Sequence, residues 1–221
     1  MTEHLTLPRA IVFDLDGTLI DSRADIARAC NHVLQWAGRE SLPIETISSF
    51  VGDGARNLLA RAFGISEQAP EIGALFEEWQ RFYVEHPADE TKLLPGALRA
   101  LQELSARGVA LGIVTNKART VTLAIIEAFQ LKPYLSALYA GGDGPLKPSP
   151  EPIVAIARDL QVSVHELWVV GDGTQDILAA RAAGARGIAI AGGFQDAEKL
   201  RAAGPDALYE SLDAFVDAVS H

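Results

Sequence analysis

The chain has 221 residues, of which 48% are hydrophobic and 22% are charged, which is typical of a globular protein and excludes collagen-like, disordered and disulfide-rich classes. Its 19 Lys and Arg against 29 Asp and Glu give a net charge of −10, which argues against binding to nucleic acid or to an anionic membrane. Cys30 is the only cysteine, so the chain cannot form an intrachain disulfide or a cysteine-based zinc site.

The N-terminal stretch MTEHLTLPRAIVF carries an acidic residue where a secretory signal would carry basic ones. No uninterrupted apolar stretch approaches the roughly 20 residues that span a bilayer. A single cysteine suits a reducing compartment. We therefore expect a cytoplasmic protein that has neither membrane nor nucleic acid partners.

Short apolar runs that end in polar or glycine-containing turns recur along the chain and predict buried strands. The first two runs are residues 9–13, followed by Asp14, and residues 109–114, followed by Thr115-Asn116. The other two are residues 167–170, followed by the turn at 171–173, and residues 186–190, followed by the glycines at 192–193. Helical patterns lie between them, at 97–106, 118–129, 153–160 and 177–183. The alternation predicts a parallel sheet that is covered on both faces and binds ligands at the carboxyl ends of its strands.

Residues from about Ser22 to about Glu90 interrupt this alternation. They carry helix-period patterns at 24–36, 55–63 and 72–84, with no convincing strand between them. Pro87 and the turn at 94–96 mark the return to the alternating pattern. The sequence therefore predicts an all-helical insertion after the first strand.

The loop after the first strand, Asp14-Leu15-Asp16-Gly17-Thr18, places two carboxylates two residues apart, where both can point toward one cavity. An Asp-Gly pair is also common in plain turns, so this loop alone leaves both interpretations open. The ends of the other strands supply complementary groups, which favours a site.

At these loops the chain resembles the haloacid dehalogenase superfamily of phosphatases. The four motifs of that superfamily occur here in order, as DLDGT at 14–18, TN at 115–116, KPSP at 147–150 and GDGTQD at 171–176. The resemblance covers nearly the whole chain and likens the helical insertion to the helical cap of that superfamily. It implies an α/β fold with a Rossmann-like parallel sheet core, residues 1–20 and 91–221, and an inserted all-helical cap domain, residues 21–90.

The resemblance also implies roles for the residues of these motifs. Asp14 would attack phosphorus to form an aspartyl phosphate, and Asp16 would protonate the leaving oxygen and later activate water. Lys147 would orient Asp14 and offset charge on the transferring phosphoryl group, although a lone loop lysine is usually solvated. The Thr115 hydroxyl and the Asn116 backbone amide would bind phosphoryl oxygens, but Thr-Asn after a strand is also an ordinary helix cap.

Four carboxylates that converge on one cavity would repel one another unless a divalent cation lay among them, and ligands that are all oxygen favour Mg²⁺ over zinc. By the resemblance, Mg²⁺ takes the Asp14 carboxylate, the Asp16 backbone carbonyl and the Asp172 carboxylate, and Asp176 binds directly or through water. Since Mg²⁺ also takes an oxygen of a bound phosphate, the cluster predicts a phosphoryl substrate.

Two motif positions refine this interpretation. Thr18 is typical of phosphatases in the superfamily, whereas the mutase branch tends to carry Val, and we assign Thr18 to substrate binding. Gly173 departs from the Ser that phosphatases of this subgroup often carry. Asp172 and Asp176 keep their spacing, so we still expect metal binding.

The segment VGDGAR at 51–56 resembles the VGxGA segment of phosphoglycolate phosphatases. We assign Gly54 and Arg56 to substrate binding, with Arg56 meeting a substrate carboxylate through a bidentate contact. Equally, Asp53 could cap a helix whose exposed face carries Arg56.

Other side chains of the insertion are expected to have structural roles. His32 and His86 are expected at the surface or in packing, because the acid and base roles are already filled. Trp36, Trp79 and Phe82 occupy helical positions that predict packing rather than a base-stacking platform. No lysine occurs between residues 22 and 90, which argues against the phosphonoacetaldehyde hydrolase branch, whose cap lysine forms a Schiff base.

These observations predict a Mg²⁺-dependent phosphomonoesterase for a small phosphorylated metabolite, with 2-phosphoglycolate as the most specific expectation. The alternatives are a phosphatase for a sugar phosphate, a nucleotide or pyrophosphate, a phosphosugar mutase, and a non-catalytic binding protein. Both a monomer and a homodimer agree with the sequence.

Overall fold

The computed structural model describes residues 7–220, and its main element is one sheet of six parallel strands in the order β5-β4-β1-β6-β7-β8. The strands are β1 (Ala10–Phe13), β4 (Ala110–Ala118), β5 (Ala137–Gly141), β6 (Leu167–Gly171), β7 (Arg186–Ile190) and β8 (Ala207–Tyr209). The predicted Rossmann-like parallel sheet is confirmed. The sequence pattern misses β5 and β8, which form the two edges of the sheet and are only partly buried.

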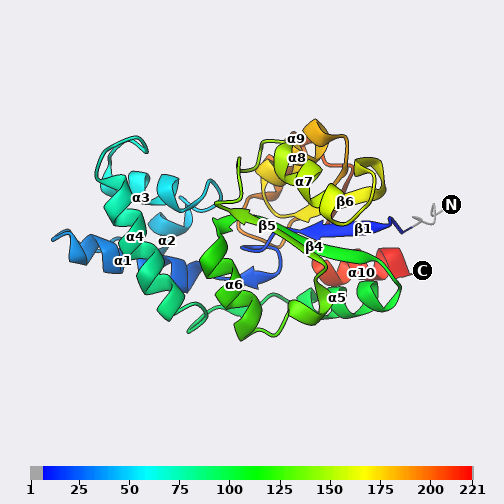
Figure 1. Cartoon of the computed structure of the whole chain (residues 1–221), viewed down its shortest axis with the longest axis horizontal. Helices are drawn as coiled ribbons and strands as arrows, with labels where there is room; N and C mark the ends of the chain where they lie inside the picture. The colour runs from blue at the N-terminus through cyan, green and yellow to red at the C-terminus, as the bar shows by residue number, and fades with distance from the viewer. Residues whose placement is uncertain (1–6, 221) are drawn as a thin grey trace.

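Both faces of the sheet are covered because its strands alternate their side chains between two cores. Ile11 and Phe13 point into one core, while Ala10 and Val12 point into the other. The first core is covered by α5 (Ala97–Ala106), α6 (Arg119–Ala128) and α10 (Leu212–Ser220), and the second by α7 (Glu151–Asp159) and α8 (Thr174–Ala183) (Figure 1). Helix α9 (Ala197–Ala203) packs beside α8, and short 3-10 turns occupy Lys132–Tyr134 and Val164–Glu166.

One predicted boundary is wrong. The second strand does not end before Thr115 but continues as β4 through Ala118. Helix α6 then begins at Arg119, and its N-cap residue, Ala118, has no side chain that could cap it. Thr115-Asn116 therefore lies inside a strand, and the interpretation of this pair as a helix cap is wrong.

The helical insertion consists of α1 (Arg23–Trp36), α2 (Ile44–Ser48), α3 (Ala55–Phe63) and α4 (Ile72–Glu85). These helices form a group at the end of the molecule away from α5 and α10 (Figure 1). The chain leaves and re-enters the core through β2 (Ile20–Asp21) and β3 (Lys92–Leu93), which pair antiparallel and which the sequence pattern does not reveal. The exact division at residues 20 and 90 stays a prediction.

Most of the side chains with expected packing roles follow that expectation. Trp79 is 2% exposed, and Phe82 stacks on His32 at a centroid distance of 4.0 Å. His86 is half-exposed and pairs with an aspartate. The expectation for Trp36 is wrong: it is 57% exposed, because α1 ends at this residue and no further turn extends its buried stripe.

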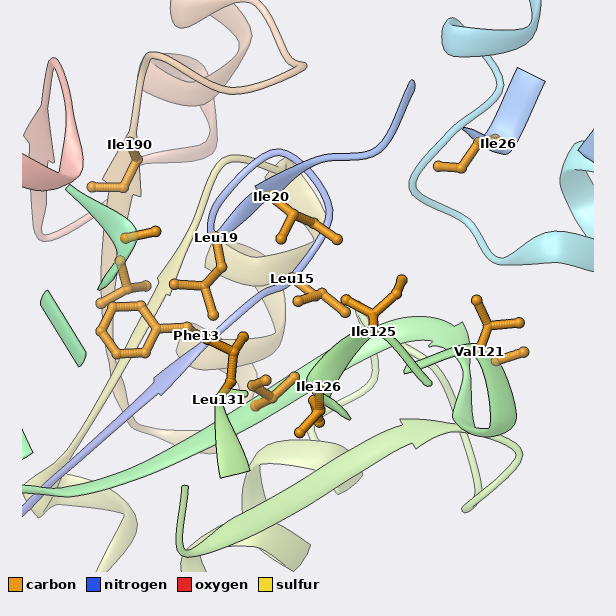
Figure 2. Close-up of a cluster of buried hydrophobic side chains, with 14 of the residues drawn as sticks. Phe13, Leu15, Leu19, Ile20, Ile26, Val121, Ile125, Ile126, Leu131 and Ile190 are labelled. Carbon is orange, nitrogen blue, oxygen red and sulfur yellow. The ribbon is translucent and has the colours of Figure 1, made fainter. Parts of the chain in front are cut away.

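A buried cluster anchors the loop that follows β1 (Figure 2). Phe13 and Leu15 lie in it with Leu19 and with side chains of α6. The Leu15 carbonyl accepts a hydrogen bond from the Leu19 N–H at 2.9 Å. Burial of Leu15 fixes the loop on which Asp14 and Asp16 reach the cavity described below.

Within residues 7–220, no helix is long and apolar enough to cross a bilayer. The first six residues of the N-terminal stretch, on which the cytoplasmic expectation partly rests, lie outside the described residues.

Candidate active site

The carboxyl ends of β1, β4 and β6 bring three of the predicted motifs together. Asp14 follows β1, and its N–H donates to the Val170 carbonyl on β6 at 2.9 Å. Thr115 and Asn116 lie in the last part of β4, and Asp172 follows β6. This is the sheet edge at which a parallel α/β fold binds its ligands.

Three aspartates form a buried cluster at this edge, each with one carboxylate oxygen within 4.8 Å of the others. Asp14, Asp172 and Asp176 are 6%, 3% and 0% exposed. Burial and the charge of Asp176 raise the pKa of Asp14 to about 7, although Lys147 opposes the shift. Burial and the charge of Asp14 raise the pKa of Asp172 to about 7. These are carboxylates with too little positive charge around them, and a hard divalent cation suits such an oxygen donor set.

Lys147 is the cation of this cluster. Its Nζ lies 2.9 Å from Asp14 Oδ1 and 2.6 Å from Asp176 Oδ1, and it donates to the Val114 carbonyl at 2.6 Å. Burial acts to lower the pKa of Lys147, but the two carboxylates outweigh burial and raise the pKa above its ordinary value. These contacts place the lysine beside Asp14 and not in solvent. The peptide bond that joins Lys147 to Pro148 is cis.

The Asp16 carboxylate lies outside the cluster of three. Its carboxylate accepts hydrogen bonds from the Ser22 hydroxyl and from Lys117 Nζ. Asp16 lines the same cavity as Asp14, so the two aspartates of the first loop share a space but have different cations. The metal contact expected from its backbone carbonyl stays a prediction.

Lys117 lines this cavity too and belongs to none of the motifs singled out above. It is 6% exposed. Side chains two residues apart in a strand lie on the same side, so a strand that continues past Thr115 would place Lys117 beside it. The lysine directly after the Thr-Asn pair is therefore the sequence signal for this site residue. It was missed because the strand was expected to end before Thr115.

The other predicted residues of the strand ends have distinct places. Thr115 is buried and lines the cavity. The side chain of Asn116 also lines it, donates to the carbonyls of Gly52 and Lys147, and accepts from the Lys147 N–H, each at 2.9 Å. The Thr18 hydroxyl donates to Asp172 at 2.8 Å. Thr18 is not among the residues that line the cavity, and its substrate contact stays a prediction.

The segment at 51–56 reaches the cavity with its glycine but not with its arginine. Gly54 lines the cavity. Arg56 is exposed, lies 5.0 Å from the centroid of the Phe76 ring, and lines a separate depression. Its carboxylate contact stays a prediction. In the alternative, the helix cap by Asp53 is wrong, since Gly54 is the N-cap residue of α3 and Asp53 pairs with Arg61, whereas the exposed position of Arg56 is confirmed.

Gly173 stands where phosphatases of the subgroup often carry Ser, and the side chain of Gln175 fills the space beside it. A Cβ on Gly173 would lie 2.2 Å from Nε2 of Gln175, so the Gln175 amide occupies the space that a serine would need. Gln195 holds this amide by donating to its Oε1 at 3.0 Å. The Gly173 N–H still donates to Asp176 at 2.9 Å. The glycine therefore leaves the position of Asp176 intact.

The cavity has a volume of about 50 Å³ and is walled by both parts of the chain. The sheet side contributes the aspartates Asp14, Asp16 and Asp172 together with Thr115, Asn116 and Lys117. The helical insertion contributes Ile26, Val51, Gly52, Gly54, Ala55, Leu58 and Trp79.

A family model of haloacid dehalogenase-like hydrolases matches residues 11–190. The chain is 36% identical over 218 residues to phosphoglycolate phosphatase of Chromobacterium violaceum, and the match covers 96% of this chain and 97% of that protein. It is 34% identical to phosphoglycolate phosphatase of Nitrosospira multiformis, with 95% of each chain covered.

The fold is similar to the crystal structure of a predicted phosphoglycolate phosphatase from Haemophilus somnus. The TM-score is 0.88 at 25% identity, and the match covers 98% of this chain and 100% of the other.

Proposed function

The chain belongs to the haloacid dehalogenase-like hydrolase family, and on that premise we propose that it is a Mg²⁺-dependent phosphomonoesterase whose preferred substrate is 2-phosphoglycolate. The names of its relatives support this substrate. A small phosphorylated metabolite is the broader class to which that substrate belongs.

The observation that carries the proposal is the charge of the buried site. The acidic cluster carries three negative charges when ionised, and Lys147, the lysine in contact with it, carries one positive charge, which leaves two negative charges to balance. One Mg²⁺ ion would supply that balance and, when bound, positive charge for the phosphoryl oxygens. Asp14 and Asp172 would hold it, with Asp176 as a direct ligand or a partner through water.

The proposed reaction gives Asp14 and Asp16 the roles that the resemblance of their loop to the superfamily implies, and both residues line the cavity. Asp14 attacks phosphorus, an Asp14–phosphorus bond forms, the bond to the leaving oxygen breaks, and Asp16 gives its proton to that oxygen. Water then attacks phosphorus and gives a proton to Asp16, the bond between phosphorus and the Asp14 oxygen breaks, and phosphate leaves as the Asp14 carboxylate is restored. Lys147, 2.9 Å from Asp14, holds the nucleophile in place through both steps.

The helical insertion acts as a cap in this proposal, with residues 21–90 as cap and residues 1–20 and 91–221 as core. Two observations support this division: Gly52 and Trp79 of the insertion line the cavity, and β2 pairs with β3 where the chain crosses between the two parts. A cap that closes the cavity excludes water other than the reacting molecule.

The proposal is tested by phosphate release from a panel that contains 2-phosphoglycolate, a hexose phosphate, a nucleoside monophosphate and pyrophosphate, with Mg²⁺ and with chelator. We expect 2-phosphoglycolate to be hydrolysed fastest, chelator to abolish release, and Asp14→Asn to remove it. Asp159→Asn, on the exposed end of α7, is the matched control and should retain full activity.

Each other outcome has a definite meaning. Faster release from another ester would replace the substrate and keep the mechanism. Conversion of a hexose phosphate into its isomer without free phosphate would indicate a mutase. Equal activity of Asp14→Asn and the wild type would overturn the proposed mechanism.

A further inference from the structure

Lys117 is a second buried lysine near the acidic cluster, and its partners differ from those of Lys147. Its Nζ lies 3.0 and 3.2 Å from the two carboxylate oxygens of Asp16 and donates to Tyr83 Oη at 2.9 Å. Its side chain is 2% exposed. The two lysines thus form ion pairs with different carboxylates: Lys147 contacts the acidic cluster, and Lys117 contacts Asp16.

Tyr83 ties this lysine to the helical insertion. It lies on α4, is fully buried, and has its ring centroid 4.5 Å from Lys117 Nζ. Burial raises the pKa of Tyr83 to about 12, so the phenol stays protonated while its oxygen accepts from the ammonium. Asp16 and Lys117, by contrast, belong to the core, on the loop after β1 and on β4.

Asp16 has few other partners. The Ser22 hydroxyl also donates to its carboxylate, and the Asp16 side chain is 13% exposed. Without Lys117, this carboxylate would keep the Ser22 contact but lose its charged partner. A displacement of about 1 Å at a reacting group costs about 100-fold in rate.

We propose that Lys117 is a positioning residue that holds the Asp16 carboxyl group for proton transfer to the leaving oxygen, and that Tyr83 makes this placement depend on the packing of the helical insertion. The inference rests on the proposed function, in which Asp16 moves the proton. The proton passes from Asp16 to the leaving oxygen as the phosphorus–oxygen bond breaks, and Asp16 regains one from the attacking water. Lys117 keeps its own protons throughout.

The test compares two substrates that differ in their need for that proton. The alkoxide that leaves 2-phosphoglycolate needs a proton, whereas 4-nitrophenolate leaves 4-nitrophenyl phosphate without one. In rapid-quench single turnovers with Mg²⁺, we expect Lys117→Met to slow phosphorylation of the enzyme by 2-phosphoglycolate about 100-fold or more. Phosphorylation by 4-nitrophenyl phosphate should slow less than about 5-fold, and phosphoenzyme should accumulate because its hydrolysis also needs Asp16.

Three further variants make the result specific. Asp16→Ala should show the same dependence on the leaving group, and the double variant Lys117→Met/Asp16→Ala should lose little beyond Asp16→Ala alone. Tyr83→Phe keeps the Lys117–Asp16 contact and should show the same pattern with a smaller loss, about 3- to 10-fold on 2-phosphoglycolate. Thermal unfolding of each variant reports whether it is folded, and Tyr83→Phe carries the test if Lys117→Met does not fold.

Three results would overturn the inference. An equal loss of phosphorylation rate with both substrates in folded Lys117→Met indicates a structural role only. A higher KM for 2-phosphoglycolate with an unchanged kcat indicates that Lys117 binds the leaving group. A wild-type enzyme that turns over neither substrate overturns the proposed function and this inference with it, whereas wild-type activity on 2-phosphoglycolate keeps the two questions separate.

Discussion

The side chain of Asn116 joins the last part of β4 to the helical insertion, with its Nδ2 2.9 Å from the carbonyl oxygen of Gly52. The same amide donates to the Lys147 carbonyl and accepts from the Lys147 N–H, each at 2.9 Å. One buried amide therefore holds both the loop that carries Lys147 and the loop that contains Gly52, which lines the cavity.

Replacing Asn116 by aspartate should lower Tm more than replacing it by alanine. Asn116→Ala leaves the Lys147 N–H and two carbonyls unpaired, which costs about 1–3 kcal/mol for a buried group. Asn116→Asp keeps the acceptor but points an oxygen at two carbonyl oxygens, so it should lower Tm further than Ala does. Thermal unfolding at pH 8 checks this order, and an aspartate variant as stable as the alanine variant would contradict it.

A side chain at Gly17 should disturb the acidic cluster. Gly17 has φ +86°, and a Cβ there would lie 2.2 Å from Asp172 Oδ2. We expect Gly17→Ala to lose most of the rise in Tm that Mg²⁺ gives the wild type, because a displaced Asp172 binds the ion more weakly. Gly38→Ala is the matched control: Gly38 also has a positive φ, +71°, but a Cβ there meets nothing within 4 Å. Equal stabilisation of both variants by Mg²⁺ would disprove the prediction.

Gly173 and Gln175 should show coupled effects. Gly173→Ser forces the Gln175 amide away from Gln195 and should cost about 1 kcal/mol, which is about 2–4 °C in Tm for a chain of this size. In a Gln175→Ala background the obstructing amide is absent, so the same serine should cost close to nothing. A double-mutant cycle followed by thermal unfolding checks the coupling, and an equal cost in both backgrounds would refute it.

The metal-free protein should lose stability as the pH rises from 6 to 8. The pKa values of Asp14 and Asp172 are about 7 in the folded chain and about 3.9 for unfolded aspartate. Between those values the folded state binds more protons than the unfolded state, so the free energy of unfolding falls with rising pH. We expect Tm in chelator to drop by several degrees over this window and Mg²⁺ to remove most of the drop.

The double variant Asp14→Asn/Asp172→Asn serves as the control for this pH effect, because its amides do not titrate. Its Tm in chelator should change far less between pH 6 and pH 8. A wild-type Tm that is flat or rises in chelator over the same window would show that these two carboxylates are not the source.

The sequence alone was enough to predict four of the six strands, β1, β4, β6 and β7, and the sheet edge at which Asp14 and Asp172 lie. Each aspartate directly follows one of these strands, and parallel strands end at the same edge of a sheet. The pairing of β1 with β6, which makes the two carboxylates neighbours, is a feature of the tertiary structure. The helical insertion was also predictable, since the 3.6-residue period in α1, α3 and α4 is a local signal. The short β2–β3 pair was missed because two residues per strand are too few to show a period.

The tertiary structure alone decided which cation each aspartate meets and which side chains reach the cavity. Lys117 contacts Asp16, which lies 101 residues away in the chain, and Tyr83, which lies 34 residues away. Arg56 turns to Phe76 instead of the cavity, because the packing of α3 against α4 sets its direction. Local sequence determines where a strand or helix forms, whereas contacts across the chain depend on how those elements pack, and that packing gives the two buried lysines their separate partners.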